Sequence, residues 1–236
     1  MNTTGNTILI TGGSAGIGLA IAKQFAAQGN QIIITGRNRE RLDQAIAEIA
    51  NITAGQVNVV AIQSDVVDAA DIGQLVNRVK QDYPQLNLLI NNAGSAFAYS
   101  LGEDDTSRYA AEEIRTNYLA VVRLTALLLP MLKQQPEAAI VNVTSIVAFS
   151  PFIAVPTYSA SKAALHVYTQ MLREQLKASS VQVYELIPPL VNTAFSQAIG
   201  GAAGIPPEEV ASDLWKAIRI GQLDVPVGQA KAVVPQ

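Results

Sequence analysis

The sequence predicts an α/β fold, a single-domain, doubly wound parallel sheet of the Rossmann type, with about seven strands and helices on both faces. Short apolar runs rich in β-branched residues alternate along the chain with longer amphipathic stretches. These runs lack strict alternation of apolar and polar residues, as expected when helices cover both faces of a parallel sheet. One open sheet with its helices readily accommodates 236 residues, so residues 1–236 are expected to form one domain.

Six strands are predicted, each from an apolar run between turn or helix signals. They cover residues 7–11, 31–35, 57–63, 86–91, 138–144 and 181–187. Helical stretches fall between them, the first over residues 19–28 and a long one over residues 112–133. Residues 195–207, rich in glycine, alanine and proline, are expected to form a mobile loop that closes over a substrate as a lid.

The composition favours a single enzyme domain and excludes several other classes. Apolar residues make up 49% and charged residues 15%, so much of the chain should be buried in a core or against another subunit. A net charge of −3 leaves no basic field for nucleic acid. Without cysteine there is no disulfide and no thiolate, and no metal site is predicted. Neither a secretory signal nor an apolar run long enough for a membrane is visible, so a cytoplasmic protein is expected.

A glycine-rich turn near the N-terminus has the character of a dinucleotide phosphate site. The turn reads Thr11-Gly12-Gly13-Ser14-Ala15-Gly16-Ile17-Gly18 and lies between a predicted strand and a predicted helix. Unpaired amides at a helix N-terminus attract an anion, and glycines let the backbone approach a pyrophosphate closely. A simple helix-entry turn is the alternative, but the strand–turn–helix context favours dinucleotide binding.

Tyr158 and Lys162 lie four residues apart and would share one face of a helix. The unperturbed pKa of a phenol is about 10, so a positive charge beside it is the direct way to make it a useful acid or base. Alone, the pair also fits a half-buried tyrosine next to a solvated lysine. Ser145 and residues 91–94 follow the ends of two predicted strands and should reach the same edge of the sheet, which favours a functional role.

Together these motifs resemble the short-chain dehydrogenase/reductase family over nearly the whole chain. The matching residues are Thr11-Gly12-x-x-x-Gly16-x-Gly18, Asp65-Val66, Asn91-Asn92-Ala93-Gly94, Asn117, Ser145 and Tyr158-x-x-x-Lys162. Residues 185–193 and 227–232 more narrowly resemble an oxidoreductase subgroup encoded with the D-alanylation system of lipoteichoic acid. The resemblance implies an enzyme that transfers a hydride between a nicotinamide cofactor and a carbonyl or alcohol substrate.

Four residues carry the catalytic roles that the resemblance implies. Tyr158 exchanges a proton with the substrate oxygen, and Ser145 hydrogen-bonds that oxygen. Lys162 binds the nicotinamide ribose and, with the oxidised ring, lowers the pKa of Tyr158. Asn117 steadies a water that connects Lys162 to solvent. For Ser145 and Asn117, a helix cap or a polar helix residue is the alternative.

The cofactor is expected to be NADP(H) in preference to NAD(H). NAD-preferring relatives place an aspartate where Gly36 stands, and here Arg37 follows, whose guanidinium can bind a 2′-phosphate bidentately. A solvated role for Arg37 is the alternative. Pro188-Pro189 replaces the more usual Pro-Gly and is expected to shift the backbone near the nicotinamide. The expected cofactor contacts are Gly12, Ser14, Gly16, Ile17, Gly18, Arg37, Asp65, Val66, Asn91, Ala93, Gly94, Tyr158, Lys162, Pro188, Val191 and Thr193.

The substrate is expected to be a small to medium, largely apolar aldehyde or ketone, because no lysine or arginine is evident around it to hold an anion. Its expected contacts are Ser145, Tyr158, Phe97, Phe149, Phe152 and Phe195. Two other functions are alternatives, a non-catalytic dinucleotide-binding sensor or scaffold, and a nucleotide-sugar epimerase or dehydratase. The complete Ser145, Tyr158 and Lys162 set argues against the first, and the short remainder after the sixth strand argues against the second.

Two broad apolar helices predict a homodimer, with a tetramer as the alternative. Residues 112–133 and the helix of Tyr158 carry apolar side chains well beyond the stripe that covers one face of a sheet. The family resemblance implies that these helices pair with their copies across a two-fold axis. Leu128 is expected to face outward there, whereas the single histidine, His166, is expected to be structural or on the surface. If the protein is instead a monomer, the extra apolar residues line the edges of its helix layer.

Overall fold

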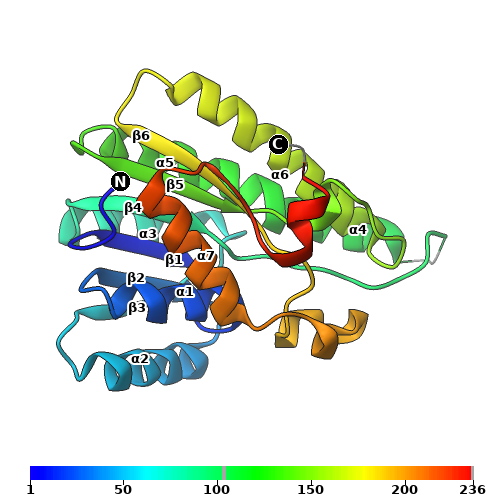
Figure 1. Ribbon diagram of the computed structural model, residues 1–236, viewed down its shortest axis with the longest axis horizontal. Coiled ribbons are helices and arrows are strands. Elements are labelled where there is room, and N and C mark those ends of the chain that lie inside the picture. The colour runs from blue at the N-terminus through cyan, green and yellow to red at the C-terminus, as the bar shows by residue number, and fades with distance from the viewer. Residues whose placement is uncertain (103–104, 235–236) are drawn as a thin grey trace.

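The computed structural model describes residues 1–102 and 105–234, which form one seven-stranded parallel sheet between two layers of helices (Figure 1). Residues 103–104 and 235–236 of the predicted domain lie outside the described residues. The strands run in the spatial order β3-β2-β1-β4-β5-β6-β7. This order confirms the doubly wound α/β prediction. The strands are β1 (Thr7–Thr11), β2 (Gln31–Gly36), β3 (Val59–Gln63), β4 (Leu86–Asn91), β5 (Ala138–Val143), β6 (Val181–Ile187) and β7 (Asp224–Pro226).

Seven α-helices are found in the described residues: α1 (Gly16–Ala26), α2 (Arg39–Thr53), α3 (Ala69–Asp82), α4 (Thr106–Ile114), α5 (Ala120–Leu132), α6 (Pro156–Leu176) and α7 (Pro207–Ile220). Helices α1 and α7 lie in front of the sheet in Figure 1, and α3 and α5 lie behind it. Within the described ranges, no helix is both long and apolar enough to cross a membrane. The cytoplasmic location stays a prediction.

Local sequence signals set several of the helix ends. The side chains of Asn38 and Asp68 cap α2 and α3 by accepting hydrogen bonds from first-turn amides. Pro156 opens α6, where its missing N–H and fixed φ cost nothing. Gly221 ends α7 with a left-handed backbone, at a φ of 72°.

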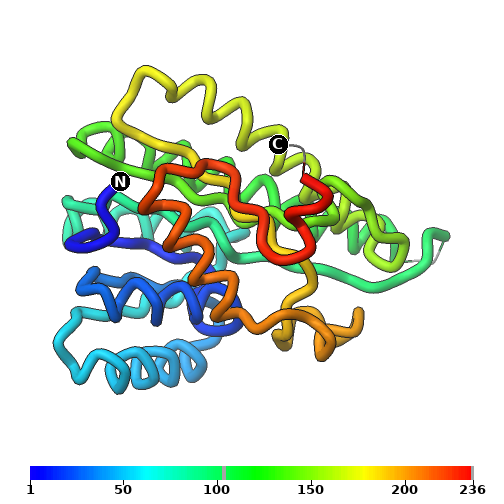
Figure 2. Tube along the Cα trace, viewed as in Figure 1, coloured from blue at the N-terminus to red at the C-terminus, as the bar shows by residue number. Residues whose placement is uncertain are grey.

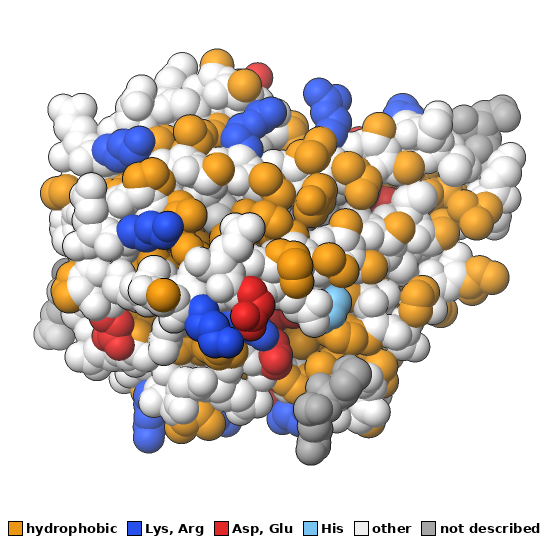
Figure 3. Space-filling view, turned by 90° about the horizontal axis from the view of Figure 1, so that it is seen from above, with side chains coloured by type: hydrophobic (Ala, Val, Ile, Leu, Met, Phe, Trp, Pro, Cys, Tyr) orange, Lys and Arg blue, Asp and Glu red, His pale blue; other side chains and the backbone are white. Residues whose placement is uncertain are grey.

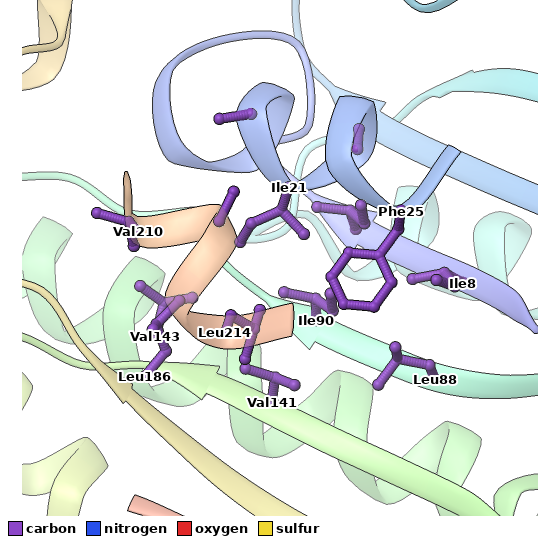
Figure 4. Close-up of a cluster of buried hydrophobic side chains, with 14 of the residues drawn as sticks. Ile8, Ile21, Phe25, Leu88, Ile90, Val141, Val143, Leu186, Val210 and Leu214 are labelled. Atoms are coloured by element: carbon purple, nitrogen blue, oxygen red, sulfur yellow. The ribbon is translucent and has the colours of Figure 1, made fainter. Parts of the chain in front are cut away.

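Each face of the sheet has its own hydrophobic layer. Successive strand residues point to opposite faces, so Ile8 joins the layer with Phe25 of α1 and Leu214 of α7 (Figure 4), whereas Leu9 joins the layer under α3, α5 and α6. All five residues of β1 are buried. Burial on both faces explains why the predicted strands lack an alternating pattern.

The long helix predicted over residues 112–133 differs from the structure in one functionally important way. Helix α4 already begins at Thr106, and the π-helical turn Arg115–Leu119 joins it to α5. The prediction that Leu128 faces outward is wrong, because Leu128 has 0% exposure within the layer beneath α5. Leu124, Leu128 and Leu132 are four residues apart, so they share the face that meets the sheet.

Residues 195–207 are more ordered than a mobile loop. They contain most of the 3-10 helix Ala194–Ile199 and all of the short 3-10 helix Gly201–Ala203, and α7 starts at Pro207. The segments that follow β4, β5 and β6 all leave the sheet on the right of Figure 2. Residues 195–207 therefore lie at the end of the sheet where the functional groups gather, and their movement as a lid stays a prediction.

Candidate active site

Three neighbouring hollows lie at the carboxyl ends of the strands, where the strand order reverses between β1 and β4. We call them the outer hollow (about 430 Å³), the central hollow (about 210 Å³) and the apolar hollow (about 390 Å³). Gly12, Ala93 and Gly94 line both the outer and the central hollow. Tyr158 and Phe195 line both the central and the apolar hollow. Tyr158 therefore lies at a junction between two hollows of different character.

The glycine-rich turn presents the start of α1 to the central hollow. Ala15 precedes the helix and supplies no side-chain cap, so the first-turn amides are available to a ligand. Gly16 has a φ of +53°, which other residues rarely adopt. A Cβ on Gly18 would lie 2.3 Å from the Gly12 carbonyl oxygen, so no larger residue fits under the turn. This geometry suits the close approach of a pyrophosphate to backbone amides.

The outer hollow contains three buried hydroxyl groups that lack a hydrogen-bond partner among the described residues. They belong to Thr35, Ser64 and Ser95, all of which line this hollow. Together with the arginine and carboxylate side chains of this hollow, these residues give it a polar lining. A polar lining suits the hydroxyls and ring nitrogens of a nucleoside, so the residues present fit the adenosine part of a dinucleotide.

Two arginines line the outer hollow beyond the end of β2. Arg37 was predicted from the sequence, whereas Arg41 was not. Asn38 accepts a hydrogen bond from the Arg41 amide at 2.9 Å and so starts α2 at this point. The four-residue spacing of the two arginines could have revealed Arg41, because it equals about one helical turn. Asp65 lines the same hollow and also accepts a hydrogen bond from the Val67 amide at 3.1 Å, so it stabilises the turn after β3, and its contact with a cofactor stays a prediction.

Ser145, Tyr158 and Lys162 come together at the junction. Ser145 follows β5 and caps a short 3-10 helix, whereas Tyr158 and Lys162 lie on one face of α6. All three side chains are buried. The Lys162 ammonium lies 5.6 Å from the centre of the Tyr158 ring and donates a hydrogen bond to the Val143 carbonyl oxygen at 2.8 Å.

Burial controls the ionisation of this group. Burial raises the pKa of the Tyr158 phenol well above its usual value, Ser145 opposes this through a hydrogen bond, and the negative charge of Glu113 adds to it. Burial lowers the pKa of Lys162 to about 8. The Lys162 ammonium bonds a backbone carbonyl, and the lowering of the Tyr158 pKa by Lys162 together with an oxidised nicotinamide stays a prediction. Tyr158 is therefore protonated at neutral pH, which is the form that can donate a proton.

Asn117 lies in the π-helical turn and connects the loop after β4 to the helix of Tyr158. Its amide nitrogen donates to the Ser95 carbonyl and to the Ser161 hydroxyl, each at 2.9 Å, and its oxygen accepts the Ser95 amide at 2.9 Å. Asn117 thus fixes the position of α6 relative to the β4 end. Its contact with a water beside Lys162 stays a prediction.

The hollows include most, but not all, of the predicted contacts. Besides Ser145, Tyr158 and Lys162, they include Gly12, Ser14, Gly16, Ile17, Arg37, Asp65, Val66, Ala93, Gly94, Phe152, Pro188, Val191, Thr193 and Phe195. Four predicted contacts do not line the hollows: Gly18, Asn91, Phe97 and Phe149. Asn91 is buried and donates to Asn142 at 2.9 Å, and Phe97 stacks on Tyr109 with ring centres 4.5 Å apart. Both side chains therefore have partners within the protein.

The doubly wound sheet, the glycine turn and the buried Ser145, Tyr158 and Lys162 together define a dinucleotide-binding oxidoreductase as the class of protein. The family model described as short chain dehydrogenase matches residues 6–203. The chain therefore belongs to the short-chain dehydrogenase/reductase family and is an oxidoreductase. Binding of NAD or NADP is typical of this family.

Relatives with known sequences or structures agree with this assignment. The chain is 41% identical over 214 residues to the uncharacterized oxidoreductase DltE of Bacillus subtilis (strain 168), covering 90% of this chain and 82% of the relative. It is 32% identical over 193 residues to a fatty acyl-CoA reductase of Acinetobacter baylyi (strain ATCC 33305 / BD413 / ADP1), covering 81% and 64%. A short-chain dehydrogenase from Sphingobium yanoikuyae in complex with NADPH has a TM-score of 0.85 at 29% identity, covering 93% and 87%. The L-sorbose reductase of Gluconobacter frateurii, complexed with NADPH and L-sorbose, has a TM-score of 0.80 at 26% identity, covering 91% and 89%.

Proposed function

We propose that this protein is an NADP(H)-dependent oxidoreductase that interconverts a largely apolar aldehyde or ketone and the corresponding alcohol. The observation that carries this proposal is the position of Tyr158 between the central and the apolar hollow, with Ser145 beside it. One hollow continues into a polar site suited to a nucleotide, and the other offers an apolar site for a second molecule. A proton donor at the junction of these two hollows suits the transfer of a hydride between a cofactor in one and a substrate in the other.

In this proposal each hollow binds a different part of the reacting molecules, and the residues at the junction carry out the chemistry. The outer hollow would hold the adenosine part of the cofactor, the start of α1 its pyrophosphate, and the central hollow its nicotinamide. When bound, a reduced nicotinamide supplies a hydride to a carbonyl carbon. Tyr158 donates its proton to the carbonyl oxygen, and Ser145 hydrogen-bonds the same oxygen. The buried Lys162 supplies a positive charge next to the nicotinamide site.

The preference for NADP(H) rests on Arg37 and Arg41. Both arginines line the outer hollow, where guanidinium groups suit a 2′-phosphate, and Gly36 offers no carboxylate to repel it. The Sphingobium yanoikuyae dehydrogenase and the L-sorbose reductase were both solved with NADPH, which supports the same choice.

The substrate class follows from the lining of the apolar hollow. Phe152, Val155, Leu190, Val191 and Ile199 contribute to it, and it is lined by no lysine or arginine to hold an anionic group. Phe195 reaches it from residues 195–207, with its ring centre 6.0 Å from that of Tyr158. We infer that this segment covers a bound substrate as a lid.

The proposal is tested by measuring the oxidation of NADPH and of NADH with a panel of apolar aldehydes, apolar ketones and short anionic keto acids. We expect turnover of apolar carbonyls with NADPH, and a loss of about 100-fold or more in Tyr158→Phe. Tyr184→Phe removes a phenol remote from the hollows and serves as the matched control. Tight NADPH binding without turnover of any compound would instead favour a dinucleotide sensor, and turnover of keto acids alone would contradict the apolar substrate class.

A further inference from the structure

A buried carboxylate lies behind the segment that carries Ser145. Glu185 in β6 is 1% exposed, and its Oε1 accepts a hydrogen bond from the Thr144 hydroxyl at 2.8 Å. Its two oxygens lie 3.0 and 2.9 Å from Nδ1 of His166. A buried carboxylate is costly unless it is paired and hydrogen-bonded, and these contacts satisfy it. The buried Glu185 carboxylate therefore obtains its hydrogen bonds from the residue before Ser145 and from α6.

His166 extends this network to the far side of Ser145. It lies four residues after Lys162 on α6, and its side chain keeps 20% exposure. Its ring packs edge-on against Phe149, with ring centres 4.5 Å apart. Phe149 ends the 3-10 helix Ile146–Ala148, which Ser145 begins. The Glu185–His166 pair thus contacts the residue immediately before Ser145 and the residue that ends its helical turn.

Apart from its hydrogen bond with the Tyr158 phenol, the Ser145 hydroxyl has few contacts that fix its position. Its only hydrogen bond to the backbone of the described residues is a long one of 3.4 Å from the Val147 amide. The orientation of the hydroxyl therefore follows the backbone of residues 144–149. That backbone is fixed on one side by the Ile146 amide, which donates to the Pro188 carbonyl at 2.9 Å. On the other side it is fixed by the Thr144 amide, which donates to the Leu186 carbonyl at 2.9 Å, and by the Glu185–His166 pair.

We propose that Glu185 and His166 act together as positioning residues, which hold the Ser145 hydroxyl at the distance from Tyr158 at which both reach one carbonyl oxygen. This inference rests on the proposed function. Neither side chain lines a hollow, so neither touches substrate or cofactor. Small displacements of reacting groups have large effects on rate, and a misplacement of about 1 Å can cost about 100-fold.

The charge state of the pair gives the proposal a second observable. Burial raises the pKa of Glu185, whereas His166 and Thr144 lower it, and the negative charge of Asp224 on β7 raises it. Asp224 is itself paired with Arg173 of α6 at 2.8 Å. Without His166, the Glu185 carboxylate takes up a proton at higher pH, which weakens the hydrogen bond that it accepts from Thr144. Loss of the histidine should therefore make turnover fall as the pH decreases.

Three variants separate positioning from a merely structural role. His166→Asn keeps an N–H donor where Nδ1 lies, His166→Phe keeps only the ring edge against Phe149, and Glu185→Leu replaces the carboxylate with an apolar side chain. We expect His166→Asn to stay within about threefold of wild-type kcat, and the other two to lose about tenfold or more. The dissociation constant for NADPH should stay unchanged in all three. The double variant His166→Phe/Glu185→Leu should show no larger decrease in kcat than either single variant, because the two residues act as one unit.

The pH profile and an activity-free measurement complete the test. The kcat of His166→Phe should fall toward acidic pH more steeply than that of Glu185→Leu, which has no carboxylate to protonate. Amide hydrogen exchange of residues 144–149 should be faster in His166→Phe and Glu185→Leu than in wild type and His166→Asn. Unchanged exchange, or wild-type kcat in both disrupting variants, would overturn the proposal. If the wild-type protein turned over no carbonyl, the proposed function would fail, and the exchange rates would still decide whether the pair holds the segment.

Discussion

Lys162 and Glu113 are ionisable side chains that the fold buries on either side of Tyr158. Lys162 is 4% exposed and Glu113 is 0% exposed. Lys162 donates to the Val143 carbonyl, and Glu113 accepts the Phe97 amide at 2.8 Å and the Thr157 hydroxyl. These partners are neutral, so neither charge is compensated by an ion pair in the described residues. Both charges should therefore reduce stability while they adjust the chemistry of Tyr158.

Lys162→Met should stabilise the protein and abolish its turnover. Burial lowers the lysine pKa from 10.5 to about 8, which corresponds to about 3 kcal/mol against folding with the charged form. The Val143 carbonyl loses its partner in the variant, so we expect a net gain of about 1–2 kcal/mol at pH 7. Urea unfolding measures this gain, with the exposed Lys177→Met as the control.

The pH dependence of the Lys162 effect has a defined sign. Because the pKa is lower in the folded state, the folded protein binds fewer protons than the unfolded chain between about pH 8 and pH 10.5. The cost of burying the ammonium is complete below about pH 8 and disappears as the pH rises toward 10.5. The advantage of the Lys162→Met variant should therefore shrink over this window, and a constant or growing advantage would contradict the assignment.

Glu113→Gln should make the Tyr158 phenol more acidic. The Glu113 carboxylate raises the pKa of Tyr158, so removal of its charge moves phenolate formation to lower pH. In carbonyl reduction, where the phenol donates the proton, the alkaline decline of kcat should move in the same direction. An ultraviolet titration of the phenolate and the pH profile of kcat measure the two effects. Glu209→Gln, a substitution at an exposed position of α7, should leave both pH curves unchanged. If the curves of Glu113→Gln were also unchanged, the prediction would be wrong.

At the scale of secondary-structure elements, the turn from β2 into α2 carries the arginines on which the proposed choice of cofactor rests. Arg37 follows β2, and Arg41 lies in the first turn of α2. Both line the outer hollow, whereas Arg39 between them pairs with Asp43 at 2.7 Å and does not line it. One helical turn therefore presents two guanidinium groups to the hollow and one to the adjacent surface.

The double variant Arg37→Ala/Arg41→Ala should bind NADPH about 10- to 100-fold more weakly, because charge-assisted bonds to a phosphate are worth about 1.5–3 kcal/mol. Its affinity for NADH should change little, since NADH has no 2′-phosphate. Fluorescence titration with each cofactor gives the ratio of the two dissociation constants, and Arg39→Ala is the matched control. An equal loss for the two cofactors would show that the arginines do not select the phosphate.

At the scale of the whole molecule, the predicted homodimer rests on exposed apolar side chains of the helices around the active site. Leu119 and Leu127, on the π-helical turn and α5, and Val167 and Met171 on α6 are all exposed. Hydrophobic side chains also cover much of the molecular face shown in Figure 3. The exposed apolar side chains on α5 and α6 favour the predicted homodimer, and they replace Leu128 as the residues to test.

Met171→Arg should convert the predicted dimer into a monomer at micromolar concentration and lower its activity, because α6 carries both Met171 and Tyr158. Light scattering gives the oligomeric state, and turnover under the same conditions gives the activity. Ile220→Arg, on the exposed end of α7, changes an apolar residue that is more exposed than Met171, and this variant should remain dimeric. A wild-type monomer with full activity would rule out the coupling.

The sequence by itself determined the fold class, the places of six of the seven strands and the residues that gather at their carboxyl ends, whereas the short β7 was not among the predicted strands. Those features depend on local information: apolar runs, a glycine turn, a proline at a helix start, and the four-residue spacing of Tyr158 and Lys162. Period and spacing are properties of neighbouring residues, so they can be recognised without knowledge of the rest of the chain.

Only the tertiary structure decided which face of a helix is buried and what each buried polar group contacts. Leu128 faces the sheet, the Lys162 ammonium bonds the end of β5, and Glu113 meets Thr157, which is 44 residues away. Glu185 and His166 pair across β6 and α6 in the same way. The physical reason is that burial and pKa shifts arise from contacts between elements that are distant in sequence, and these contacts exist only after the sheet has brought them together.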